Sequence, residues 1–242
     1  MNATLFSQIQ KLLERTYAQV GINLEDCLID RHRCAQLSIL AGRSARELSE
    51  LARTFLRTAD DRLYVGIYYS GWLIEQLERH DPRAGLSDRN IGSLIAFVEE
   101  INHALHAALQ FKNGAREIAS EDFARNLEFQ AQVDTYLVLL LFVAFFRNTR
   151  RVSRTDRRWL RFHLFERQCP KAFADRNLRA RYVETTDLAA SYTYYLDSLD
   201  GIRRLNEIRR FRSLDYSEKK TRVLALPAGK ILSRRVNLIC EN

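Results

Sequence analysis

Turn-forming residues are scarce in this chain of 242 residues, which contains 3 prolines and 9 glycines. Soluble proteins have about 5% proline and about 7% glycine on average. An all-β sandwich or barrel needs turn residues at intervals of about 8–12 positions, so the composition argues against those folds. Neither GxGxxG nor GxxxxGK[ST] occurs, and the common nucleotide-binding loops are therefore missing. We expect long helices and no nucleotide cofactor.

Cysteines are few, and neither a leader sequence nor a membrane-spanning segment is expected from the sequence. Cys27, Cys34, Cys169 and Cys240 form no CxxC pair, and four cysteines in a chain of this length do not make a disulfide framework. The first residues show no basic segment followed by an apolar one, the pattern of a secretory signal. The longest apolar run, 136–146, is shorter than the roughly 20 residues that a membrane span needs. We expect a cytoplasmic protein with no membrane partner.

Apolar residues are nevertheless abundant enough to build a core. Hydrophobic residues make up 46% of the chain and charged residues 28%, so global disorder is not expected. Apolar positions recur at helical spacing along most of the chain. The sequence predicts an all-α protein, a single helical bundle of about seven or eight helices over residues 1–220. A short basic tail, 221–242, follows it, and two β-like runs around Pro227 predict a hairpin there.

Periodicity and capping residues predict where the helices begin and end. Ser44 and Glu47 form a capping-box pattern, and Ser87 and Ser120 are placed to cap later helices. Residues 133–146 are expected in a buried helix. The predicted helical segments are 4–20, 24–40, 44–56, 64–79, 89–111, 120–146, the second half of 147–168, 175–199, and a short helix after Gly201.

The predicted helix 89–111 carries a polar stripe beside its apolar face. At about 100° per residue, Glu99, His103 and His106 fall within a narrow arc. Carboxylate and imidazole groups one turn apart can bind Zn, Fe or Mn. Glu100 and His103 also form Glu-x-x-His, the unit found in ferritin-like di-metal bundles. A second such unit and the HExxH motif are both missing from the chain.

The next predicted helix offers further ligands. Asp134 falls among apolar residues on its helical wheel, and a buried carboxylate without a partner is costly. A metal ion, a histidine or an arginine is therefore expected beside it. The predicted metal ligands are Glu99, His103, His106, Glu128 and Asp134. Two alternatives stay open, an ordinary i,i+4 pair of Glu99 with His103, and acid–base chemistry without a metal.

Two segments within residues 94–145 resemble a known group of sequences. VEEINHALHAAL followed by NLEFQAQVDTYLVLLL is similar to a group of bacterial all-helical proteins with a Glu-rich, His-containing helix and an LELQAEVDK-like segment. The resemblance implies no activity and no substrate. It implies that one site contains Glu99 or Glu100, His103, Glu128, Gln130 and Asp134.

Positive charge is concentrated towards the C-terminus of a chain whose net charge is +8. Residues 1–146 contain 15 Lys and Arg against 19 Asp and Glu, whereas residues 147–240 contain 23 against 10. The segment RNTRRVSRTDRRWLRFHLFER interleaves arginines with aromatic residues, which suits phosphate binding and base stacking. The candidate contacts to nucleic acid or to an acidic protein are Arg157, Arg158, Arg161 and His163.

Arg158 and His163 have the Arg-x4-His spacing of the HEPN ribonucleases, which are small helical domains, and the segment resembles them in that respect. Trp159 stands where those proteins usually have a polar residue. The alternative for the whole segment is a solvated helix face whose arginines pair with the acidic N-terminal region.

Two hypotheses about function follow from these patterns. The first is a metal-binding helical-bundle protein, an oxidoreductase or a hydrolase, whose open coordination position polarises water or binds oxygen. The second is a non-catalytic interaction module whose basic region, 147–240, binds nucleic acid or an acidic protein. Binding that weakens steeply with salt would favour the second.

Overall fold

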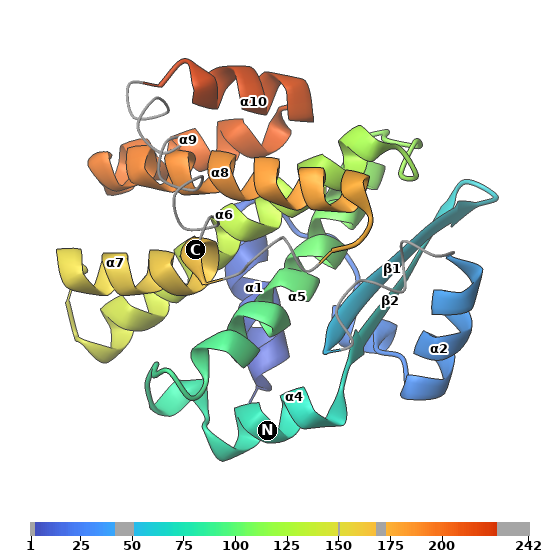
Figure 1. Ribbon diagram of the computed structural model, residues 1–242, viewed down its shortest axis with the longest axis horizontal. Coiled ribbons are helices and arrows are strands. Elements are labelled where there is room, and N and C mark those ends of the chain that lie inside the picture. Colours follow the sequence, from blue (N-terminus) through green and yellow to red (C-terminus); the bar gives the residue numbers. More distant parts are fainter. Residues whose placement is uncertain (1–2, 42–50, 150, 168–172, 227–242) are drawn as a thin grey trace.

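The computed structural model describes residues 3–41, 51–149, 151–167 and 173–226 (Figure 1). Within these ranges the chain is mainly helical and contains one two-stranded antiparallel sheet. The helices are α1 Leu5–Thr16, α2 Arg31–Leu40, α4 Gly71–Arg79, α5 Ile91–Lys112, α6 Glu121–Phe146, α7 Arg154–Arg161, α8 Arg176–Ser198, α9 Gly201–Ser213 and α10 Tyr216–Leu224. The strands are β1 Ala52–Ala59 and β2 Arg62–Tyr69. A π-helical turn, Phe162–Glu166, follows α7. The expected helical protein is confirmed in outline.

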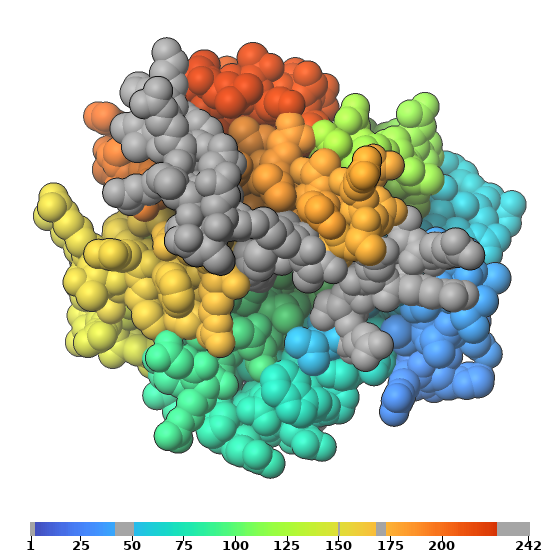
Figure 2. Space-filling view, in the orientation of Figure 1, coloured from blue at the N-terminus to red at the C-terminus, as the bar shows by residue number. Residues whose placement is uncertain are grey.

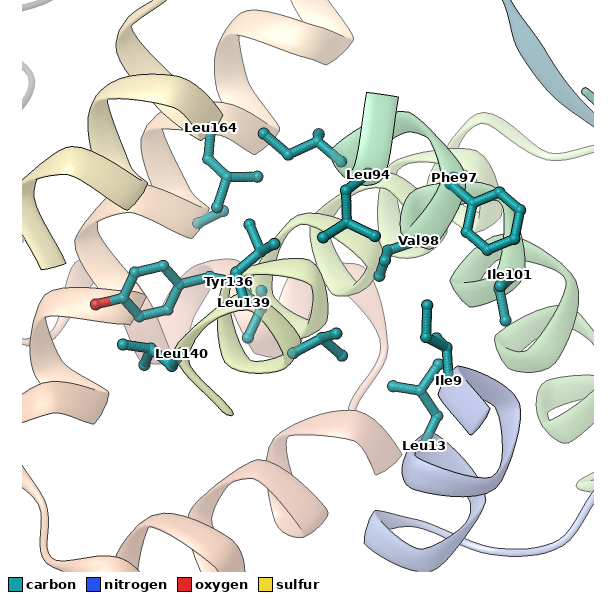
Figure 3. Packing of buried hydrophobic residues seen from close by; sticks show 14 of the residues in the cluster. Ile9, Leu13, Leu94, Phe97, Val98, Ile101, Tyr136, Leu139, Leu140 and Leu164 are labelled. Carbon is teal, nitrogen blue, oxygen red and sulfur yellow. The ribbon is translucent and has the colours of Figure 1, made fainter. Parts of the chain in front are cut away.

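Helices α5 and α6 lie at the centre of the fold and pack against each other. The hairpin, α1 and α4 contact α5, while α7, α8 and α10 contact α6. Figure 3 shows Leu94 and Val98 of α5 close to Leu139 of α6, with Ile9 and Leu13 of α1 beside them. In the space-filling view α7, α8 and α10 share one face with α4 (Figure 2). The two central helices therefore position any side chain that they contribute to a site.

Helix α6 begins where the sequence predicted. The Ser120 hydroxyl accepts a hydrogen bond from the backbone amide of Phe123, and Glu121 and Asp122 occupy the first turn, where the helix dipole favours negative charge. By length and composition α6 is the one helix in the described ranges that could cross a membrane. However, 67% of its most apolar window is buried inside the protein, as expected of a core helix.

The β-hairpin corrects two helix predictions. Residues 52–59 pair with residues 62–69, with Ala52 opposite Tyr69, where helices 44–56 and 64–79 were expected. Asp60 and Asp61 form the turn with φ angles of 49° and 53°, which matches the twist of a tight hairpin. The segment YVGIYY is rich in aromatic and β-branched residues, which favour a strand where they can pack on a neighbouring element, and the hairpin packs against α5. Only the second half of helix 64–79 is helical, beginning at Gly71 after the Ser70 cap.

The hairpin also lies within the body of the protein, not in the predicted C-terminal tail. Residues 221–224 of that tail belong to α10, which begins with a capping box of Asp215 and Glu218. Ser87 is not a helix cap, since α5 begins after Asn90, whose side chain accepts from the Ser87 amide. Residues 227–242, which include most of the predicted tail hairpin and Cys240, lie outside the described residues, as do the Ser44–Glu47 capping box and Cys169.

Candidate functional site

The predicted metal ligands divide into two groups. Glu99, His103 and Glu128 lie near α8, whose Tyr182 reaches Glu128. His106 and Asp134 instead bind each other and contact the residue that follows α1, Tyr17. We call the first group, with Glu100 and Tyr182 added, the carboxylate cluster. The second is called the buried network and consists of Tyr17, His106, Gln130, Asp134 and Lys219.

Glu128 is the centre of the carboxylate cluster. His103 Nε2 lies 3.8 Å from Glu128 Oε1, and the Tyr182 hydroxyl donates a hydrogen bond of 2.9 Å to the same oxygen. The side chains of His103 and Glu128 are 14% and 15% exposed, so both are largely enclosed and still reach solvent. Helices α5, α6 and α8 each supply part of the cluster, which is why it forms only in the folded chain.

Burial and the repulsion between neighbouring carboxylates raise the pKa values of the two glutamates that α5 contributes to the cluster. The pKa of Glu99 is raised well above its ordinary value, by burial first and then by the charges of Glu128 and Glu100. The pKa of Glu100 is also raised by burial, although His103 opposes this. The pKa of Tyr182 is also raised, mainly by burial and then by the charge of Glu128. The Tyr182 hydroxyl therefore keeps its proton and remains a hydrogen-bond donor. The cluster thus retains an acidic proton at a pH where an exposed glutamate has lost it.

The buried network is built around Asp134. His106 Nε2 lies 2.5 Å from Asp134 Oδ2, and the two side chains are 2% and 1% exposed. The other carboxylate oxygen accepts hydrogen bonds from the Tyr17 hydroxyl and from Gln130 Nε2, the latter at 3.1 Å. Lys219 Nζ donates to Gln130 Oε1 at 2.7 Å and so joins α10 to α6. Every polar group named here has a partner, as a stable buried network requires.

Burial also controls the protonation of this network. It lowers the pKa of His106, although the hydrogen bond and the charge of Asp134 oppose it. Burial lowers the pKa of Lys219 to about 7, again against the charge of Asp134. The fully buried ammonium group also donates to Asn126 Oδ1 at 2.6 Å. Near neutral pH this lysine therefore exists in both charged and neutral forms.

Sequence reasoning missed Tyr17 and Lys219. The signal for Lys219 is its position on α10 between Tyr216 and Val223, at helical spacing, so that all three face inward. The inward position of Lys219 could be inferred from the sequence only if residues 216–224 were first predicted to be a helix. Tyr17 follows the end of α1 and lies 117 positions before its partner Asp134, a separation at which no local pattern connects them.

A cavity of about 280 Å³ adjoins the buried network. Its walls are mainly apolar side chains of α1, α6 and α9, and Tyr17 and Asp134 also line it. The polar network therefore borders a space of its own, separate from the carboxylate cluster, none of whose members lines this cavity.

The described part of the chain contains no group of three or more His, Cys, Asp or Glu side chains placed so that it could hold a metal ion. His106 and Asp134 are paired with each other and so are not free to bind a metal ion. The other three predicted ligands, Glu99, His103 and Glu128, lie in the carboxylate cluster together with Glu100. The expected partner of the buried Asp134 is thus a histidine.

The predicted contacts to nucleic acid are mostly engaged inside the protein. Arg157 and Arg161 both bind the carboxylate of Asp197 on α8, and Arg161 is buried over the ring of Tyr194. His163 is also buried, and its Nε2 lies 3.0 Å from Oδ1 of the exposed Asp88. Of the four predicted residues, Arg158 is the exposed one.

No family model, no curated protein and no solved structure matches this chain. The resemblance of residues 94–145 to a bacterial group stays a prediction. The geometry does bring together Glu99, Glu100, His103 and Glu128, but it assigns Gln130 and Asp134 to the buried network.

Proposed function

We propose that the carboxylate cluster is an acid–base catalytic centre in which Glu99 donates a proton and Glu128 accepts one. The supporting observation is the raised pKa of Glu99, caused by burial and by the neighbouring charges of Glu128 and Glu100. A carboxylic acid that keeps its proton beside a second carboxylate is the usual arrangement for general acid–base catalysis.

The neighbours of Glu128 are consistent with its role as proton acceptor. Tyr182 and His103 both contact Oε1, and we therefore assign the contact with the substrate to Oε2. His103 of α5 faces Glu128 of α6, and its partly exposed imidazole connects the cluster to solvent. Because the proton acceptor Glu128 is negatively charged and repels anions, the substrate class is neutral or cationic, and hydrolysis is the simplest reaction that such a pair performs.

The second candidate is a divalent metal at the same cluster, as the sequence predicted for Zn, Fe or Mn. The observation that favours it is the concentration of carboxylate oxygens around one imidazole, donors that these metals prefer. A metal would displace the acidic proton. It would also require Glu99, His103 and Glu128 to converge, which they do not do in the described structure.

The interaction-module hypothesis has less support. Arg157 and Arg161 share the carboxylate of Asp197, and their side chains are 18% and 6% exposed, so neither is freely presented to a phosphate. Binding to nucleic acid or to an acidic protein would depend on Arg158 and on other exposed basic residues of region 147–240.

The experiment that tests the proposal is a turnover screen of the full-length protein with neutral chromogenic esters, amides and glycosides, repeated across a range of pH. We expect Glu99→Gln and Glu128→Gln each to lower turnover by about 100-fold or more, because one proton-transfer group is removed. The matched control is Glu75→Gln, an exposed glutamate on α4, which should leave turnover unchanged. Turnover that survives in both cluster variants would overturn the proposal.

Elemental analysis of protein purified without chelator separates the two candidates. Near-stoichiometric Zn, Fe or Mn that disappears in His103→Ala, together with loss of turnover in chelator, would establish the metal version. Turnover that chelator leaves intact would establish acid–base chemistry without a metal.

A further inference from the structure

A groove of about 710 Å³ lies between the C-terminal half of α6 and α1. It is apolar along α6 and basic along α1, and it includes none of the residues of the carboxylate cluster. We call it the α1–α6 groove and define it by Lys11, Leu12, Arg15, Leu141, Phe145 and Phe146.

The apolar side of the groove is exposed to an unusual degree. Phe145 is 78% exposed and Leu141 is 51% exposed, and the two lie four residues apart on the same face of α6. The ring of Phe146 lies 5.4 Å from that of Phe145, so the aromatic groups are adjacent. Contiguous exposed apolar side chains of this kind mark a surface that is covered by a partner.

The opposite side of the groove carries positive charge. Lys11 and Arg15 lie one turn apart on α1, and both line the groove. Neither forms an ion pair with a carboxylate anywhere in the described ranges. Arg83, which is 51% exposed and pairs with Asp81, is a third basic residue that lines the groove. An anionic partner with an apolar layer beneath its charges therefore complements this surface.

We propose that the α1–α6 groove docks the protein on the surface of an anionic lipid bilayer. Leu141, Phe145 and Phe146 would enter the boundary between headgroups and acyl chains, and Lys11 and Arg15 would contact lipid phosphates. A second copy of this chain fits less well, because a symmetric contact would bring the same positive charges together. The sequence argument against a membrane partner concerned spanning helices, and peripheral docking requires no span.

Co-sedimentation with lipid vesicles tests the proposal on the full-length protein. We expect binding to vesicles of phosphatidylcholine with about one third phosphatidylglycerol, weak binding to phosphatidylcholine alone, and weaker binding as salt rises. Phe145→Ser should lower the affinity by about tenfold, and the double change Lys11→Glu and Arg15→Glu by at least as much. Trp72→Ser is the matched control, because Trp72 on α4 is 54% exposed and does not line the groove.

Three results would overturn the proposal. The first is wild-type protein that fails to bind the anionic vesicles. The second is binding that Phe145→Ser and the charge reversal leave unchanged, or that Trp72→Ser weakens equally. The third is light scattering that shows a dimer which Phe145→Ser dissociates, with no vesicle binding, because the groove would then be covered by a second copy. All the substituted residues are exposed or line the open groove, and thermal unfolding confirms that each variant is folded.

Discussion

His106 Nε2 and Asp134 Oδ2 are 2.5 Å apart in the interior of the protein, where both side chains are almost inaccessible to solvent. Because burial lowers the pKa of His106, the imidazole is neutral at physiological pH and its Nε2–H donates to the carboxylate. Asp134 also accepts a hydrogen bond from Tyr17, so α5, α6 and the end of α1 depend on one carboxylate.

We predict that Asp134→Asn lowers the free energy of unfolding by about 2 kcal/mol, because a buried amide cannot satisfy His106 and Tyr17 as the carboxylate does. Urea denaturation measures the change. The control is Asp61→Asn, in an exposed pair with Arg116, where a loss of at most about 1 kcal/mol is expected. Equal losses in the two variants would show that the buried pair has no special role.

Lys219 should make stability depend on pH in the alkaline range. The unfolded lysine binds a proton below its ordinary pKa of 10.5, whereas the folded one binds it only below about 7. Between these values the unfolded state holds more protons, so wild-type stability falls as pH falls, by at most about 1.4 kcal/mol per pH unit. The charges of Asp134 and Asp215 raise the pKa of Lys219 and that of Arg212 lowers it, but burial has the largest effect.

Lys219→Met removes this slope, and denaturant midpoints measured from about pH 10 to about pH 7 should therefore fall less than those of the wild type. Lys220→Met is the control and should retain the wild-type slope, because Lys219 is intact. Parallel curves for wild type and Lys219→Met would contradict the prediction.

Glu99 should act in the opposite direction. Its folded-state pKa is raised, so above the ordinary value of 4.5 the folded state holds a proton that the unfolded state has lost. Stability then falls as pH rises through the folded pKa. We expect Glu99→Gln to be more stable than the wild type at about pH 8 and similar near pH 4, by thermal unfolding. A difference that does not change with pH, or one shared by Glu75→Gln, would be inconsistent with a raised pKa.

Asp197 joins α7 to α6 through two arginines and a tyrosine. Arg157, Arg161 and the Tyr136 hydroxyl all bind its carboxylate. Asp197→Ala leaves two largely buried guanidinium groups unpaired, and we expect a loss of about 3 kcal/mol in urea denaturation. Arg158→Ala, at an exposed position, should change stability by less than about 0.5 kcal/mol. Comparable effects of the two substitutions would mean that the ion pairs are not important for stability.

The central helices were predictable because their signals are local. Ser120 with Glu121 and Asp122 indicates the start of α6, and the apolar run that follows indicates burial. The hairpin was not predictable from spacing, since aromatic residues at 64–69 suit a buried helix as well as a strand. Packing against α5 favours the strand over the helix. In this packing the ring of Tyr69 lies 4.6 Å from that of Phe97 on α5.

The sequence by itself determined which side chains line one face of α5, because helical periodicity is a property of neighbouring residues. It placed Glu99, His103 and His106 beside the core and predicted a partner for a buried Asp134. Only the tertiary structure decided that these residues serve two separate clusters. The angle at which α5 and α6 pack, and the return of α8 and α10 across them, bring Tyr182 to Glu128 and Lys219 to Gln130. Such contacts join residues 54 and 89 positions apart, and their geometry depends on the packing of whole helices, which no local pattern encodes.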